Sequence, residues 1–210
     1  VEAVCDGDRE DPPNVAAPPA DVRSTLASLV DCSLVQRVPG PGDRPRYRLL
    51  ESVRAYGQDR LEERGEAHRI AERHAGFYAA LTEAAHPVIW SGAPDLVGVL
   101  AEMDAEHDNL AAAMRWCLAE GRKETAIRLG SGAHMWAMYH ARISQYGEWI
   151  RAALALPGEV SPLLRARGLE VVSTYYTRAE RPREQAVLLP ELLAAAREAG
   201  DQRREAWALW

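Results

Sequence analysis

Apolar residues recur at helical spacing over residues 20–32, which predicts a short helix near the start of the chain. Apolar and polar residues then alternate over residues 33–38 and again over residues 46–50, and Gly and Pro residues are concentrated between them. This pattern predicts two strands joined by a turn, a β-hairpin. Helical spacing returns over residues 51–64, and Gly65 fits the C-terminal stop of that helix.

After Gly65 the pattern is almost entirely helical. A helix is expected over residues 66–85, with Pro87 and the pair Ser91-Gly92 closing it, and two more helices follow. The chain shows no further alternating segment, so we expect these helices to pack on helices.

The last third of the chain repeats itself. Helices are predicted in two pairs, which cover residues 123–139 with 143–156 and residues 162–177 with 182–199. Small residues occupy matching places in the second helix of each pair, Gly147 and Ala186, which gives a period of 39 residues. Small residues at such places let neighbouring helices approach closely. A third unit begins at Asp201, and the pattern is typical of tetratricopeptide-like repeats.

These elements predict a mainly α-helical fold class. A partial winged helix, with the hairpin as its wing, is followed by a helical bundle and then by tetratricopeptide-like helical repeats. The corresponding domains are a partial winged-helix domain over residues 1–64, a connecting helical bundle over residues 65–121, and repeats over residues 122–210 that are truncated at the C-terminus. Within the first domain, residues 6–19 hold four prolines and many acidic residues, which predicts a loop.

Composition narrows the class of protein further. The formal net charge of -6 and the isoelectric point near 5.6 argue against a nucleic-acid clamp, because that affinity comes mainly from Lys and Arg on phosphates. Cys5, Cys32 and Cys117 are odd in number and widely spaced, which supports neither a disulfide framework nor a metal site. With no long apolar run and no signal-peptide pattern, we expect a reducing, cytoplasmic location and no membrane contact.

Four arginines, Arg37, Arg44, Arg46 and Arg48, lie on or beside the predicted wing. Winged helices use basic wings to grip the minor groove or phosphates, so these residues are candidate nucleic-acid contacts. The alternative is that they are solvated hairpin ends or pair with acidic residues elsewhere in a longer protein. The alternative is favoured, because the preceding helix offers a single cation and a recognition helix needs more.

No arrangement of side chains in the sequence is typical of an enzyme or a metal site. His68 and Glu72 share a helix face, but His74 lies six residues from His68 and points elsewhere. His134 and His140 are also six residues apart and fail for the same reason. There is no Gly-x-Ser-x-Gly motif, so we expect no catalytic residue, no metal and no enzyme activity in this chain.

The repeats offer a second kind of candidate site. Repeat proteins bind peptides or effector proteins through side chains on the first helix of each unit. Six residues on the predicted first helices are therefore candidate partner-binding residues: Arg128, His134, Met138, Arg165, Glu170 and Thr174. The sequence does not determine which of them face outward.

The chain contains five segments that together resemble the large bacterial signal-transduction ATPases of the STAND type: LVDCSLVQ, RYRLLESVRAYGQDRLEERGE, AERHAGFYAALTEAA, EMDAEHDNLAAAMRWCLAEG and WIRAALALPG. Transcriptional regulators of the AfsR-like and large LuxR-like kinds are the most similar type. In that family a P-loop ATPase module with a winged helix precedes tetratricopeptide-like repeats. The chain begins with Val1 rather than Met, which indicates a piece of a longer protein.

The resemblance implies that the parent protein binds ATP or ADP, switches between closed and oligomerising states, and signals to a DNA-binding domain elsewhere. This chain has no GxxxxGK[ST] motif to hold phosphates, so we expect no cofactor within it. The Met-His-Asp motif of related nucleotide switches corresponds here to Leu49, Leu50 and Glu51. Leu50 lacks the polar atom with which that histidine contacts ADP, and this departure speaks against direct nucleotide sensing by the winged helix.

We therefore expect a regulatory or sensor segment of a nucleotide-switched transcriptional regulator. The repeats would bind a protein or small-molecule effector and relay its binding to an ATPase core outside this chain. The expected partners are that ATPase core, the effector, and DNA through a domain outside this chain. Two alternatives remain open: an ATP-independent protein-binding repeat scaffold, and a DNA-binding winged helix with appended repeats.

Overall fold

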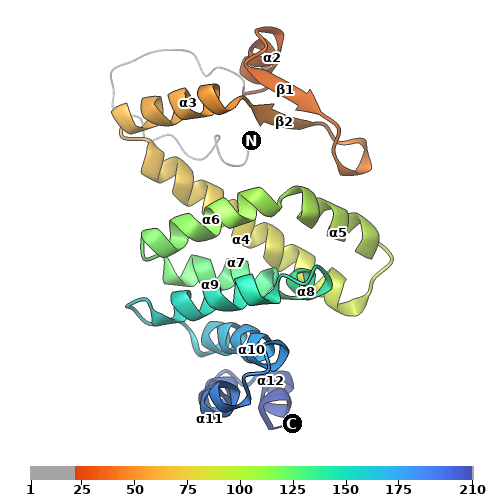
Figure 1. Cartoon of the computed structure of the whole chain (residues 1–210), viewed down its shortest axis with the longest axis vertical. Helices are drawn as coiled ribbons and strands as arrows, with labels where there is room; N and C mark the ends of the chain where they lie inside the picture. Colours follow the sequence, from red (N-terminus) through yellow and green to blue (C-terminus); the bar gives the residue numbers. More distant parts are fainter. Residues whose placement is uncertain (1–21, 210) are drawn as a thin grey trace. The chain divides into compact units, whose positions relative to one another are not determined.

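The computed structural model describes residues 22–209, which form two compact units (Figure 1). The first unit extends to Phe77 and the second begins at Tyr78, within one long helix. The division into three domains, over residues 1–64, 65–121 and 122–210, remains a prediction. The loop predicted over residues 6–19 lies outside the described residues.

The first unit contains the predicted helix, hairpin and helix. Its elements are α2 (Val22–Asp31), β1 (Val35–Val38), the 3-10 turn η1 (Pro41–Asp43), β2 (Arg46–Leu49), α3 (Glu51–Glu63) and the first part of α4 (Ala67–Ser91). The strands β1 and β2 are antiparallel, with Val35 opposite Leu49 and Val38 opposite Arg46. At Gly40 a Cβ atom would lie 2.4 Å from the carbonyl oxygen of Arg44, so only glycine fits this turn.

The winged-helix elements contribute little buried core within the described residues. Before α4, Val35 is the one described residue that is buried. Tyr47, Leu49 and Leu50 are each more than 40% exposed, so β2 and the residue before α3 present apolar side chains to solvent.

The helix α4 continues through Pro87, so the prediction that Pro87 helps to close this helix is wrong. Proline has no N–H to donate to the carbonyl four residues earlier, and the helix loses one hydrogen bond there. Beyond the proline, Ile89 is 1% exposed, and the Trp90 ring stacks on His86 with 6.2 Å between centroids. We attribute the continuation of α4 to this burial and stacking. The helix ends at Ser91, where Gly92 adopts a positive φ of 63°.

The second unit is a stack of helices that begins with the end of α4. The further helices are α5 (Leu96–Ala105), α6 (His107–Ala119), α7 (Lys123–Gly132), α8 (His134–Tyr139), α9 (Ile143–Ala155), α10 (Pro162–Arg178), α11 (Pro182–Glu198) and α12 (Gln202–Leu209). Along the stack α10 packs against α7, α9 and α11, and α11 packs against α12. The mainly α-helical fold class with a β-hairpin wing is confirmed.

One predicted helix, over residues 123–139, is interrupted at Ala133 and forms α7 and α8 instead. Gly132, the last residue of α7, lies directly against α4, because a Cβ atom on it would lie 2.7 Å from the backbone carbonyl carbon of Thr82. Gly130 and Gly132 also weaken the helical preference of this segment. The spacing of apolar residues in the sequence does not reveal this contact between Gly132 and α4.

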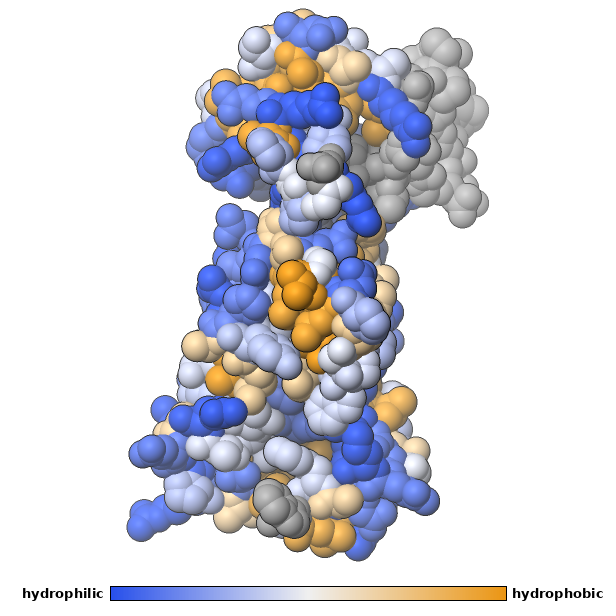
Figure 2. Space-filling view, turned by 90° about the vertical axis from the view of Figure 1, so that its right-hand side faces the viewer, coloured by the Kyte–Doolittle hydropathy of each residue, from blue (hydrophilic) through white to orange (hydrophobic). Residues whose placement is uncertain are grey.

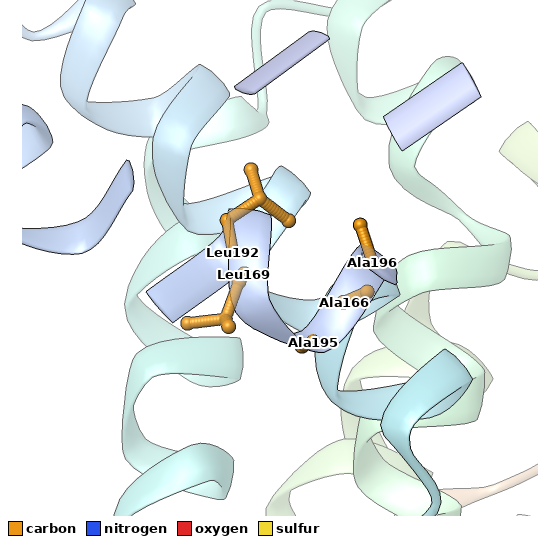
Figure 3. Packing of buried hydrophobic residues seen from close by; sticks show 5 residues of the cluster. All are labelled: Ala166, Leu169, Leu192, Ala195 and Ala196. Carbon is orange, nitrogen blue, oxygen red and sulfur yellow. The ribbon is translucent and has the colours of Figure 1, made fainter. Parts of the chain in front are cut away.

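Small apolar residues let the paired helices α10 and α11 pack closely, as Figure 3 shows. Ala166 and Leu169 of α10 meet Leu192, Ala195 and Ala196 of α11, and each of the five is at most 5% exposed. Three of the five are alanines, which bring the two backbones together without leaving voids.

Gly147 in α9 lies directly against α10, as its small size predicts. A Cβ atom there would lie 2.3 Å from the Cβ atom of Tyr175. Its counterpart Ala186 in α11 is exposed instead.

Substitution of Gly147 by Ala is therefore expected to lower the free energy of unfolding by about 1–3 kcal/mol, because α9 and α10 must move apart. The control is Gly76→Ala in α4, where no atom lies within 4 Å of the added Cβ and a gain of up to about 1 kcal/mol is expected. Urea unfolding followed by circular dichroism measures both. Equal effects of the two substitutions would show that the α9–α10 contact is not tight.

Candidate functional site

Three of the four wing arginines lie on the two faces of the hairpin, and the fourth lies in its turn. Residues opposite one another in an antiparallel pair point to the same side, and successive residues alternate. Arg48 is opposite Gln36 and Arg46 is opposite Val38, so Arg46 and Arg48 share a face. Arg37, opposite Tyr47, lies on the other face, and Arg44 follows η1 in the turn.

The positive charge of this unit is concentrated on the hairpin. Residues 33–50 contain four arginines and one carboxylate. In α3 the cations have carboxylate partners on the same helix, since Arg54 bonds Glu51 and Arg60 bonds Glu63. With four arginines against one carboxylate, the hairpin has the largest excess of positive charge among the described winged-helix elements, and this charge could attract a phosphate backbone.

A second candidate site lies in the second unit, where arginines, histidines and carboxylates from α4, α7, α8, α10 and the start of α12 meet. Its members, here named the arginine cluster, are Glu83, His86 and Trp90 of α4, Arg128 of α7, His134 of α8, Arg167 and Glu170 of α10, and Asp201, Arg203 and Arg204 at α12.

Glu83 joins three helices at one end of the arginine cluster. Its Oε2 accepts a hydrogen bond of 2.7 Å from Arg128, and its Oε1 accepts one of 3.3 Å from Arg167. Burial by itself would raise the pKa of Glu83, but the hydrogen bonds and charges of Arg128 and Arg167 outweigh it and hold the pKa below its usual value. Glu83 is therefore ionised at neutral pH and ties α4 to α7 and α10.

Glu170 holds the other end of the arginine cluster and is 4% exposed. Arg203 places two nitrogens 2.9 Å from its two carboxylate oxygens, and Arg204 donates to Oε2 from Nε at 2.8 Å. Arg204 also pairs with Asp201. Because Glu170 lies on α10 and both arginines lie on α12, this network joins the second predicted pair of helices to the helix that follows that pair.

Two histidines, His86 and His134, are influenced by the charges of the arginine cluster, and burial lowers the pKa of both. For His86 the charges of Arg167, Arg203 and Arg204 act in the same direction, against Glu170. For His134 burial is the main cause and brings the pKa to about 4. Both imidazoles are therefore neutral at neutral pH.

The buried His134 makes stability depend on pH. Its pKa is about 4 in the folded chain against 6.5 as the ordinary value, so the unfolded chain binds this proton more readily. The stability contribution is complete above pH 6.5 and is lost as the pH falls towards 4, by up to about 3 kcal/mol. Unfolding free energies measured between pH 7 and 4.5 should fall more steeply for the unmodified chain than for His134→Gln. Parallel curves would contradict this assignment.

The six predicted partner-binding residues do not form one group in the structure. Arg128, His134 and Glu170 belong to the arginine cluster, and the Thr174 hydroxyl donates to the backbone carbonyl of Glu170 at 2.9 Å. Arg165 instead pairs with Glu191 of α11 at 2.6 Å, and Met138 is half-buried on α8 outside the arginine cluster.

Several members of the arginine cluster have no counterpart among the sequence-based candidates: Glu83, His86, Trp90, Arg167, Asp201, Arg203 and Arg204. One signal could have found Arg167, because it follows Arg128 by the 39-residue period of the repeats, and both arginines bind Glu83. Glu83, His86 and Trp90 lie on a helix outside the predicted repeats, so no repeat pattern points to them.

Other features of the described residues are weaker candidates. A cavity of about 130 Å³ lies between α4 and α5 and is lined by Leu81, Ala84, Ala85, Val99, Glu102 and Met103. It is smaller than ordinary ligand pockets, which hold about 300–1,000 Å³. Figure 2 shows a small apolar patch on an otherwise largely polar face. Residues 22–209 contain neither a group of three metal-ligating side chains nor a helix long and apolar enough to cross a membrane.

Comparison with known proteins bears on the first unit most directly. Residues 15–62 match the family model of the winged helix-turn-helix domain, so the chain contains such a domain. Over 197 residues it is 32% identical to proteins of Mycobacterium bovis and Mycobacterium tuberculosis, each named "Putative HTH-type transcriptional regulator". The alignment covers 87% of this chain and 21% of each relative, so the chain spans about a fifth of their length. No solved structure matches the chain.

Proposed function

We propose that this chain is the regulatory segment of a bacterial transcriptional regulator. In this proposal the helical stack of the second unit, with its tetratricopeptide-like repeats, binds an effector, and the winged helix-turn-helix domain passes the bound state to the rest of the protein. The observation that carries the proposal is the arginine cluster, where Glu83 and Glu170 collect side chains from α4, α7, α10 and α12. A ligand at this cluster would contact helices distant in sequence and could alter how they stack.

The relatives support the regulatory half of the proposal. They are described as regulators of the HTH type and align with most of this chain, including both the winged helix and the helical stack. Regulation of transcription in a bacterium takes place in the cytoplasm, which is the location we propose.

The experiment that tests this function compares transcripts. The gene that encodes this chain is deleted in its own host and restored with the unmodified sequence. We expect a defined set of transcripts to change on deletion and to return on restoration. An unchanged transcript profile under conditions in which the protein is made would contradict a role in transcription.

A nucleotide switch in the parent protein is a further part of the proposal. It rests on the resemblance to signal-transduction ATPases, and the ATP- or ADP-binding module would lie outside these 210 residues because GxxxxGK[ST] is absent from them. The coding sequence before Val1 tests it directly. A P-loop motif there supports the switch, whereas an open reading frame without one leaves an ATP-independent repeat scaffold.

The second candidate function is direct DNA binding by the wing. It is favoured by the four arginines on the hairpin, against one carboxylate, and by the shared face of Arg46 and Arg48. If the wing binds DNA, affinity should fall steeply with salt.

Replacing both Arg46 and Arg48 by Gln should then weaken binding and reduce the slope of log K against log [salt] by about 2, one for each phosphate that is no longer neutralised. Fluorescence anisotropy with a labelled duplex measures this. The matched control is Arg54→Gln with Arg60→Gln, two arginines of α3 that pair with glutamates. No binding at low salt, or equal weakening in both double variants, would remove this candidate.

A further inference from the structure

The exposed edge of the arginine cluster is formed by the Trp90 ring, with the Arg203 guanidinium over it and the His86 imidazole stacked on it. The guanidinium carbon of Arg203 lies 4.7 Å from the centroid of the Trp90 ring, and the other neighbour of that ring is His86. Trp90 is 50% exposed, the Arg203 side chain is 40% exposed and His86 is half-buried. A ligand could therefore reach all three groups from solvent.

Close to this edge lies a buried nitrogen atom of His134 that has no hydrogen-bond partner. Nε2 of His134 is buried and has no hydrogen-bond partner, although nearly all buried polar atoms in proteins have one. The side chain is 6% exposed, and the charges that act on it are those of Glu170, His86, Arg203 and Arg204. An unpartnered nitrogen in this position is the kind of group that a ligand satisfies.

The charge of the arginine cluster indicates what kind of ligand fits. Four arginines, Arg128, Arg167, Arg203 and Arg204, face three carboxylates, those of Glu83, Asp201 and Glu170. Glu124 also acts on Arg128, so the four arginines and four carboxylates balance when both imidazoles are neutral. A carboxylate adds one negative charge to this balanced cluster, whereas a phosphate monoester carries about -1.5 to -2 at neutral pH and would add a larger excess of negative charge.

We propose that the arginine cluster binds a carboxylate group of the effector, with Arg203 and His86 contacting the carboxylate, Trp90 packing on the adjoining apolar part and Nε2–H of His134 donating the buried hydrogen bond to a carboxylate oxygen. The inference rests on the proposed function, because it assigns a ligand chemistry to the same helical stack. The carboxylate could belong to a small organic acid or to an acidic side chain of a protein.

The test follows the imidazole resonances of the 210-residue chain labelled with ¹⁵N-histidine. It is titrated with butyrate, with an N-acetylated and C-amidated pentaglutamate peptide, and with inorganic phosphate. The signals of His86 and His134 are assigned with the His86→Gln and His134→Gln variants. We expect saturable shifts confined to these two histidines, with phosphate binding more weakly than the carboxylate probe.

Arg203→Gln should weaken the apparent affinity about tenfold or more, the equivalent of one lost charge-assisted hydrogen bond. The matched control is Arg165→Gln, which removes an arginine of similar exposure whose partner is Glu191 of α11. Circular dichroism checks that both variants keep their helix content, and His86→Gln provides a second variant if Arg203→Gln does not fold.

Saturation by butyrate assigns a small-molecule carboxylate, and saturation by the peptide alone assigns an acidic protein segment. Absence of saturable shifts with either carboxylate probe, equal weakening by Arg165→Gln, or tighter binding of phosphate would overturn the inference. These outcomes concern ligand binding only, so they remain distinct from a failure of the transcript experiment, which concerns the role in transcription.

Discussion

Replacing Trp136 by Ala is expected to lower the free energy of unfolding by about 3–5 kcal/mol. The side chain is 1% exposed and lies against the rings of His107, His140 and Tyr146, at centroid distances of 5.4, 5.0 and 5.9 Å. Its Nε1 donates a hydrogen bond of 2.8 Å to Asp104 of α5. The substitution removes all of these contacts and opens a cavity where α5, α6, α8 and α9 meet.

The control for this prediction is Trp207→Ala. Trp207 lies on α12 and is 42% exposed, so its loss should cost much less, within about 1 kcal/mol. Urea unfolding of the three proteins, followed by circular dichroism, gives the comparison. A loss at Trp136 no larger than the loss at Trp207 would mean that the second unit is not organised around the buried ring.

Replacing Glu170 by Gln is expected to cost about 3–5 kcal/mol, because it leaves the arginines of α12 without their central counter-charge. The Glu170 side chain is 6% exposed and the Arg204 side chain is 10% exposed, so solvent cannot compensate fully. The contact between α10 and α12 should loosen before the rest of the stack. Hydrogen exchange of α12 amides in the variant measures this loosening.

The matched control is Glu191→Gln, which removes a carboxylate that also pairs with an arginine of α10, at 2.6 Å. That pair is about half exposed on both sides, and exposed pairs contribute about 0–1 kcal/mol. If both substitutions had similar small effects, the Glu170 network would be an ordinary surface pairing, and the arginine cluster would lose its structural basis.

Local sequence signals were sufficient for the helix, hairpin and helix of the first unit. The turn residues between the strands and the glycine after α3 act over a few residues, and Gly65 has the positive φ of 67° that a helix stop requires. Periodicity likewise predicted most helices of the second unit, although α4 continues past its predicted end and one predicted helix forms α7 and α8. These features depend on interactions between residues that are close in the sequence, so a single sequence is enough to predict them.

Contacts between distant segments could not be predicted in the same way. Beyond Pro87 the helix α4 continues and buries Ile89, and next to the interruption at Ala133 Gly132 lies against Thr82 of α4. Three members of the arginine cluster, Arg128, His134 and Glu170, were candidates because they lie on the first helices of the predicted pairs, and the 39-residue period could have added Arg167. Glu83 joins it because α4 packs beside α7, and the sequence does not reveal that packing.

The most direct test of the central claim, that the arginine cluster governs a regulator of transcription, is a transcript comparison between two restored strains. The deleted gene is restored in one strain with Arg203→Gln and in the other with Arg165→Gln, and immunoblots establish equal protein amounts. The account predicts that Arg165→Gln restores the unmodified profile, whereas Arg203→Gln leaves the regulated transcripts changed. Identical, fully restored profiles in both strains would contradict the claim.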